Sequence, residues 1–141
     1  MNESPDIVLL AAEWQPRALI RAQLIEDGFE VVATNIWPKM RLHFRPFTKP
    51  RLALVDLKGL PRPACVLNDL RALMKPERVL VLTALGTVPE SDIERLGFHV
   101  VSRPIVIRDV VKAARHAIRS QAPREPGASA LEGLEVSAWR T

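Results

Sequence analysis

The residues best suited to chemistry in this sequence are one aspartate and the small residues that stand where its partners are expected. Asp56 ends the apolar run Arg51-Leu-Ala-Leu-Val-Asp56. An earlier apolar run, over 6–11, ends in Ala11 and is followed by Ala12 and Glu13. A carboxylate at a strand end can accept a phosphoryl group or ligate a hard cation when other oxygen ligands lie beside it. Alanine supplies no such ligand, so the sequence combines a reactive carboxylate with a lost acidic site.

Apolar runs alternate with helical segments along the chain, and these elements must position Asp56. The pattern predicts strands over 6–11, 30–34, 51–56, 78–83 and 99–102. It predicts helices over 17–27, 38–44, 63–74, 87–96 and 108–119, and Thr87-Val-Pro-Glu90 has the spacing of a capping box. Five strand–helix alternations indicate a three-layer, doubly wound α/β fold with a five-stranded parallel sheet and right-handed crossovers.

The carboxyl ends of parallel strands meet at one edge of the sheet, where ligands bind in folds of this type. The first predicted strand brings Ala11, Ala12 and Glu13 to that edge, and the third brings Asp56. Thr83 follows the fourth strand, and Arg103 follows the fifth. We therefore expect these side chains to converge, although they are far apart in the sequence.

Together these residues resemble the response-regulator receiver (CheY-like) family. That family has an acidic cluster after strand one, an aspartate after strand three, a Ser/Thr after strand four and a Lys-Pro after strand five. Asp56, Thr83 and Arg103-Pro104 match the last three positions, and the resemblance covers about residues 6–119. The segments Glu13-Trp-Gln-Pro16-Arg17 and Asp56-Leu-Lys-Gly-Leu-Pro61 are also similar to the family's local patterns. The resemblance implies the sheet order 2-1-3-4-5 of the flavodoxin-like folds.

The family's chemistry implies a role for each matching residue. In receivers the aspartate is phosphorylated by a partner histidine kinase, and Mg²⁺ held by the acidic pair neutralises charge on the transferred group. The resemblance therefore implies that Asp56 is the phosphoacceptor. It implies that Thr83 and Arg103 are the groups that sense the phosphoryl group.

The departures from the family pattern concern the same site. Ala11 and Ala12 replace the acidic pair, and Glu13 points elsewhere by the family pattern, which leaves at most weak Mg²⁺ binding at Asp56. Arg103 keeps the charge of the family's lysine on a longer, flatter group. The region of the aromatic switch in the fifth strand holds Val100 and Val101. We therefore predict a degenerate receiver, or pseudo-receiver, with no cofactor beyond weakly bound Mg²⁺.

The leading functional hypothesis is a single-domain receiver-like signalling protein of two-component (phosphorelay) type that acts through protein–protein interaction. Its partner would be a histidine kinase or an output protein, and a homodimer could form through the last two α/β units. One alternative is a functional response regulator phosphorylated on Asp56. Another alternative is a basic regulator that binds nucleic acid.

The nucleic-acid alternative rests on a segment without acidic residues, over 31–55. It contains five basic and three aromatic residues: Lys39, Arg41, Arg45, Lys49, Arg51, Trp37, Phe44 and Phe47. Basic side chains neutralise phosphates and aromatic rings can stack on bases. A solvated helix face whose aromatics point into the core explains the same pattern, and we favour this interpretation over nucleic-acid binding.

Composition bounds the remaining possibilities. The 141 residues, 48% hydrophobic and 26% charged, fit one soluble domain, which we place at residues 1–120, before a flexible tail at 121–141. A single cysteine excludes an internal disulfide. The absence of a membrane-length apolar run and of a signal sequence predicts a cytoplasmic protein. No phosphate-binding glycine loop, Ser/His/Asp set or HExxH motif occurs, so we do not expect an enzyme.

Overall fold

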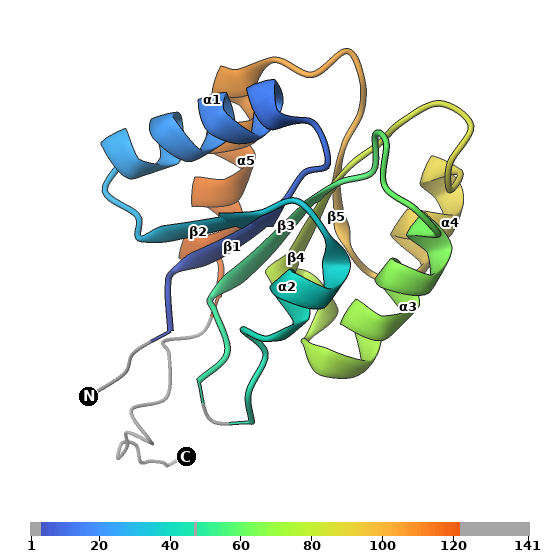
Figure 1. Cartoon of the computed structure of the whole chain (residues 1–141), viewed down its shortest axis with the longest axis horizontal. Coiled ribbons are helices and arrows are strands. Elements are labelled where there is room, and N and C mark those ends of the chain that lie inside the picture. The colour runs from blue at the N-terminus through green and yellow to red at the C-terminus, as the bar shows by residue number, and fades with distance from the viewer. Residues whose placement is uncertain (1–3, 47, 122–141) are drawn as a thin grey trace.

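A single parallel sheet organises the computed structural model, which describes residues 4–46 and 48–121 (Figure 1). The strands lie in the order β2-β1-β3-β4-β5, as predicted. Their bounds are β1 (Ile7–Leu10), β2 (Val31–Thr34), β3 (Leu52–Asp56), β4 (Val79–Leu82) and β5 (His99–Val101). Each strand is one or two residues shorter than the apolar run that predicted it.

Helices cover both faces of this sheet and give the predicted three layers (Figure 1). One face carries α1 (Trp14–Glu26) and α5 (Ile107–Arg119). The other carries α2 (Trp37–Arg41), α3 (Pro63–Leu73) and α4 (Glu90–Arg95), and a 3-10 turn (Pro76–Arg78) leads from α3 into β4.

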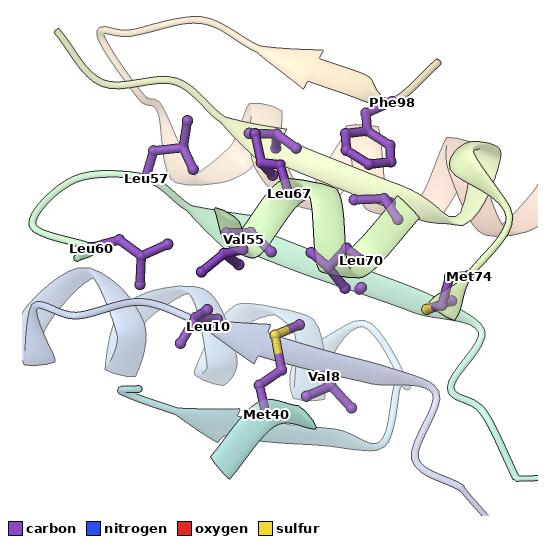
Figure 2. Packing of buried hydrophobic residues seen from close by; sticks show 14 of the residues in the cluster. Val8, Leu10, Met40, Val55, Leu57, Leu60, Leu67, Leu70, Met74 and Phe98 are labelled. Atoms are coloured by element: carbon purple, nitrogen blue, oxygen red, sulfur yellow. The ribbon is translucent and has the colours of Figure 1, made fainter. Parts of the chain in front are cut away.

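The central strands are apolar throughout because helices cover both of their faces. In β1, Ile7 and Leu9 pack toward α1 and α5, whereas Val8 and Leu10 pack toward α2 and α3. Figure 2 shows the cluster on the side of α2 and α3, in which strand side chains such as Val8 and Leu10 pack with Met40 of α2 and Leu67 and Leu70 of α3. This packing fixes the register of the strands, and the register decides which residues reach the carboxyl edge.

Local sequence explains where α1 ends and which side of α5 faces the sheet. Gly28, with a φ of +99°, follows α1 in a conformation that glycine adopts without strain. The amphipathic pattern predicted for residues 108–119 is confirmed in α5, whose buried residues are Val110, Val111, Ala114, Ala117 and Ile118. The stripe of buried alanines allows close packing on the sheet.

The capping box predicted at Thr87 is wrong. The helix begins at Glu90, and the Thr87 hydroxyl donates a hydrogen bond to the Ala84 carbonyl at 2.6 Å. The threonine therefore stabilises a turn in the β4–α4 loop, which is an alternative use of a hydroxyl that competes with capping.

A hydrogen bond fixes the C-terminal boundary of the described residues. Gln121 donates from Nε2 to the Arg51 carbonyl at 2.8 Å and so ties the residues after α5 to the start of β3. The remainder of the predicted tail, 122–141, lies outside the described residues, and the domain boundary at residue 120 stays a prediction. In the described part of the chain, every helix is too short or too polar to span a membrane.

Candidate functional site

The carboxyl edge of the sheet gathers the residues that the sequence singled out. Leu10 pairs with Val55 in the register of β1 and β3, so Ala11 and Asp56 follow at neighbouring positions. Asp56 in turn pairs with Leu82, so Thr83 follows β4 at the level of Leu57, the residue after β3. The predicted convergence therefore holds in space, since parallel strands in register end together.

Asp56 is the centre of this edge. It is 2% exposed, and it is the one charged residue among those described that is classed as buried. Arg103 contacts both of its carboxylate oxygens, with Nη1 at 3.0 Å from Oδ1 and Nη2 at 3.1 Å from Oδ2. The backbone amide of Lys58 donates to Oδ1 at 3.0 Å. A buried carboxylate is costly unless it is paired and hydrogen-bonded, and these three bonds satisfy that need.

Arg103 is joined to Thr83 as well as to Asp56. The backbone amide of Arg103 donates to the Thr83 hydroxyl at 3.1 Å, and its Nη1 donates to the Thr83 carbonyl. The Thr83 amide donates to the Val101 carbonyl at 3.1 Å. The ends of β3, β4 and β5 are thus connected by one network whose central group is the Arg103 guanidinium.

The β1 side of the site holds small residues and a second guanidinium. Ala11 is fully buried and Ala12 is half-buried. Arg17, in the first turns of α1, donates from Nη1 to the Ala11 carbonyl at 2.8 Å and to the Ala12 carbonyl at 3.3 Å. A Cβ added to Gly59 would lie 3.5 Å from the Cβ of Ala12, so the β3–α3 loop packs against this alanine.

These residues do not fit a Mg²⁺ site. Mg²⁺ prefers carboxylate oxygens in octahedral geometry. Here the one buried carboxylate is occupied by Arg103, and a guanidinium holds the carbonyls beside it. In residues 4–46 and 48–121, no three His, Cys, Asp or Glu side chains gather as a metal-binding group.

Glu13 takes no part in the contacts of Asp56. Its Oε1 lies 3.6 Å from Lys58 Nζ, and the two side chains are 46% and 54% exposed. An exposed ion pair of this kind contributes little stability because water and salt screen it.

Sequence reasoning missed the parts played by Arg17 and the Lys58 amide. The sequence carried a weak signal for Arg17, because a long cationic side chain early in α1 can reach back to the carbonyls that end β1. Lys58 follows a strand-ending aspartate by two residues, which is the spacing of an Asx turn. Val100 of β5 is half-buried and packs against the cluster that includes Ile93 of α4.

Comparisons with known proteins agree with this architecture. A receiver domain protein from Clostridium thermocellum is 20% identical, with a TM-score of 0.64, and the match covers 80% of this chain and 93% of that one. A CheY-like receiver from Methanospirillum hungatei JF-1 is 17% identical, with a TM-score of 0.67 and coverages of 80% and 92%. The receiver domain of NtrX from Brucella abortus is 20% identical, with a TM-score of 0.67 and coverages of 82% and 100%.

No protein-family model matches the chain, and no curated protein sequence matches it. The fold is therefore the CheY-like form of the flavodoxin-like fold, and it is the fold alone that the likeness at these identities shows. The chemistry of the carboxyl edge must be argued from its own residues.

Proposed function

We propose that this chain is a receiver-like signalling domain of two-component type that acts through protein contact and does not depend on Mg²⁺-assisted phosphorylation of Asp56. One observation carries the proposal: the Arg103 guanidinium binds both oxygens of the buried Asp56 carboxylate. In a receiver that accepts phosphate, a divalent cation neutralises this region during transfer. Here a side chain of the protein itself supplies the neutralising charge.

The paired state of Asp56 opposes its use as a nucleophile. Phosphorylation would require the carboxylate to leave two charge-assisted bonds, which are among the stronger hydrogen bonds in proteins. It would also place new negative charge at a site where Ala11 and Ala12 offer no metal ligands. Arg103 could stabilise a phosphoryl group, but it would first have to release the carboxylate that it holds.

The same network supports a signalling surface that stays in one conformation. Thr83 and Arg103 are the groups that would respond to a phosphoryl group, and both are engaged with each other.

We propose that the partner, a histidine kinase or an output protein, contacts the face built from α4, β5 and α5, where a homodimer could also form. We place this non-enzymatic domain at residues 1–120, ahead of the tail at 121–141, in the cytoplasm.

A phosphorylation assay tests the proposal. The full chain is incubated with acetyl phosphate and Mg²⁺, and its intact mass is measured against Asp56→Asn treated in the same way. We expect no phosphoryl addition to the wild-type chain. A gain of one phosphoryl group by the wild type, absent in Asp56→Asn, would overturn the proposal and establish the functional phosphoacceptor instead.

A restored variant makes the negative result informative. Ala11→Asp/Ala12→Asp/Arg103→Lys returns the acidic pair and the lysine of the family pattern, and it should gain a phosphoryl group under the same conditions. That result would locate the loss of reactivity in these three positions. Thermal unfolding of each variant shows that the mass measurement reports on folded protein.

A further inference from the structure

The outward side of α2 and of the loop after it combines cations with an exposed leucine. We call this the α2 basic surface and define it by Lys39, Arg41, Leu42, Arg45 and Lys49. All five side chains are exposed, and Leu42 is 68% exposed. The surface lies on the face of the sheet away from α1 and α5 (Figure 1).

The core fixes which residues of this segment face outward. Met40 is fully buried, Phe44 is 7% exposed, and Trp37 packs on the same cluster. The Trp37 and Phe44 rings lie 6.2 Å apart at 34°. Lys39 lies on the exposed side of α2, opposite Met40, and Leu42 and Arg45 are exposed in the loop that follows the helix. The prediction that the aromatics point into the core is confirmed for these two rings.

The cations of this surface are not paired within the described molecule. The ion pairs that the described residues form use Lys58, Arg95, Arg103 and Arg115. No acidic residue occurs over 31–55, so the segment offers no local counter-charge. A surface of one sign creates a field that attracts an oppositely charged partner and speeds its approach.

Exposed cations alone fit a solvated face, and Leu42 adds an exposed apolar side chain among them. The outward side of α5 differs from this surface, because its exposed residues are all polar and include an acid: Arg108, Asp109, Lys112, His116 and Arg119. On the α2 basic surface a large apolar side chain lies among the cations instead. Apolar and cationic side chains together are characteristic of protein interfaces, in which an apolar centre has a polar rim.

We propose that the α2 basic surface binds an acidic segment of a partner protein that places an apolar side chain against Leu42. Nucleic acid is the weaker match for two reasons. Trp37 and Phe44 are packed in the core and are not available to stack on bases, and a leucine gains nothing from contact with phosphate. The surface is separate from Asp56, so this proposal goes beyond the one made for that site.

Fluorescence anisotropy with a designed probe tests this inference. The probe is a labelled glutamate-rich peptide with leucines at helical i, i+4 and i+7 spacing, and the comparison ligands are the same peptide with serines for leucines and a DNA duplex. We expect the leucine peptide to bind most tightly. Leu42→Ser should lower the affinity for the leucine peptide about tenfold, which matches the burial of a leucine side chain. It should leave the affinity for the serine peptide unchanged.

Charge variants complete the test with a matched control. Lys39→Ser/Arg41→Ser/Arg45→Ser should weaken peptide binding more than tenfold and flatten its salt dependence. Arg21→Ser/Arg71→Ser/Lys75→Ser, on α1, on α3 and just after α3, removes the same charge and should change binding less than twofold. All six side chains are exposed, and thermal unfolding verifies that the variants stay folded.

Three results would overturn the inference. Tighter binding of the DNA duplex than of the peptide, unaffected by Leu42→Ser, would define a site for polyanions. Equal losses in the two charge variants would mean that net charge alone drives binding. If the peptide does not bind at low salt, the α2 basic surface is only a solvated face. None of these variants touches Asp56, so the phosphorylation assay gives its own, separate answer.

Discussion

Arginines serve opposite purposes at the carboxyl edge of the sheet and on the α2 basic surface. The Arg103 side chain is 25% exposed and binds both oxygens of a buried carboxylate. Arg41 and Arg45 are exposed, and no carboxylate of the described residues lies within ion-pair distance of them. The charge of Arg103 is therefore neutralised inside the fold, whereas the charges on α2 remain available to another molecule.

The two regions should respond very differently to the loss of an arginine, and this is the largest effect that we predict. Arg103→Ala leaves the Asp56 carboxylate buried with one backbone hydrogen bond, and should lower the free energy of unfolding by about 2–4 kcal/mol. Arg41→Ala removes the same group from an exposed position and should change it by less than about 0.5 kcal/mol. Urea denaturation of the two variants measures both values.

A double variant separates the charge effect from lost packing. Asp56→Asn/Arg103→Ala removes both charges, so it should recover a large part of the stability that Arg103→Ala loses. Equal stabilities of Arg103→Ala and Arg41→Ala would contradict the assigned difference between the regions. So would a double variant as unstable as Arg103→Ala.

The ion pair between Asp27 at the end of α1 and Arg115 of α5 is more exposed than the pair of Arg103 and Asp56. Its loss should therefore lower the stability of the fold by a smaller amount. Arg115 donates to both oxygens of Asp27, at 2.9 Å and 2.7 Å. The side-chain hydrogen bond from Arg115 lowers the pKa of Asp27 below its ordinary 3.8. A lowered pKa means that the pair stabilises the fold above the unfolded pKa and loses this contribution as pH falls through the folded one.

Thermal unfolding of wild type and Asp27→Asn at neutral and acidic pH measures this contribution. The wild type should melt slightly higher at pH 7, and the difference should shrink as pH falls through the lowered folded-state pKa of Asp27. A difference that persists at low pH would show that packing, not charge, is responsible.

The sequence predicted the fold well because its strongest signals are physical requirements of this fold. Continuous apolar runs are needed in strands that are buried on both faces, and the amphipathic pattern over 108–119 matches α5. The convergence of Asp56, Thr83 and Arg103 then follows from strand register. The start of α4 was not predictable, because the Thr87 hydroxyl binds within its own loop and does not cap the helix.

The details of the site lay beyond the sequence because they depend on side-chain conformations and loop paths. Sequence reasoning placed Arg103 near Asp56, but not with a nitrogen on each carboxylate oxygen. It gave no role to Arg17, whose contacts with the Ala11 and Ala12 carbonyls require the turn between β1 and α1. Together the two arginines place cationic groups at the Asp56 carboxylate and at the carbonyls that follow β1.

The central claim is that Arg103, and not a metal ion, balances the charge of Asp56. A Mg²⁺ titration of the wild-type chain, followed by the backbone amide signals of Ala12, Asp56 and Lys58 in NMR spectra, tests it most directly. We predict no saturable shift of these signals up to millimolar Mg²⁺, and a saturable shift in the Ala11→Asp/Ala12→Asp/Arg103→Lys variant. Saturable millimolar binding by the wild type, centred on these three amides, would contradict the account.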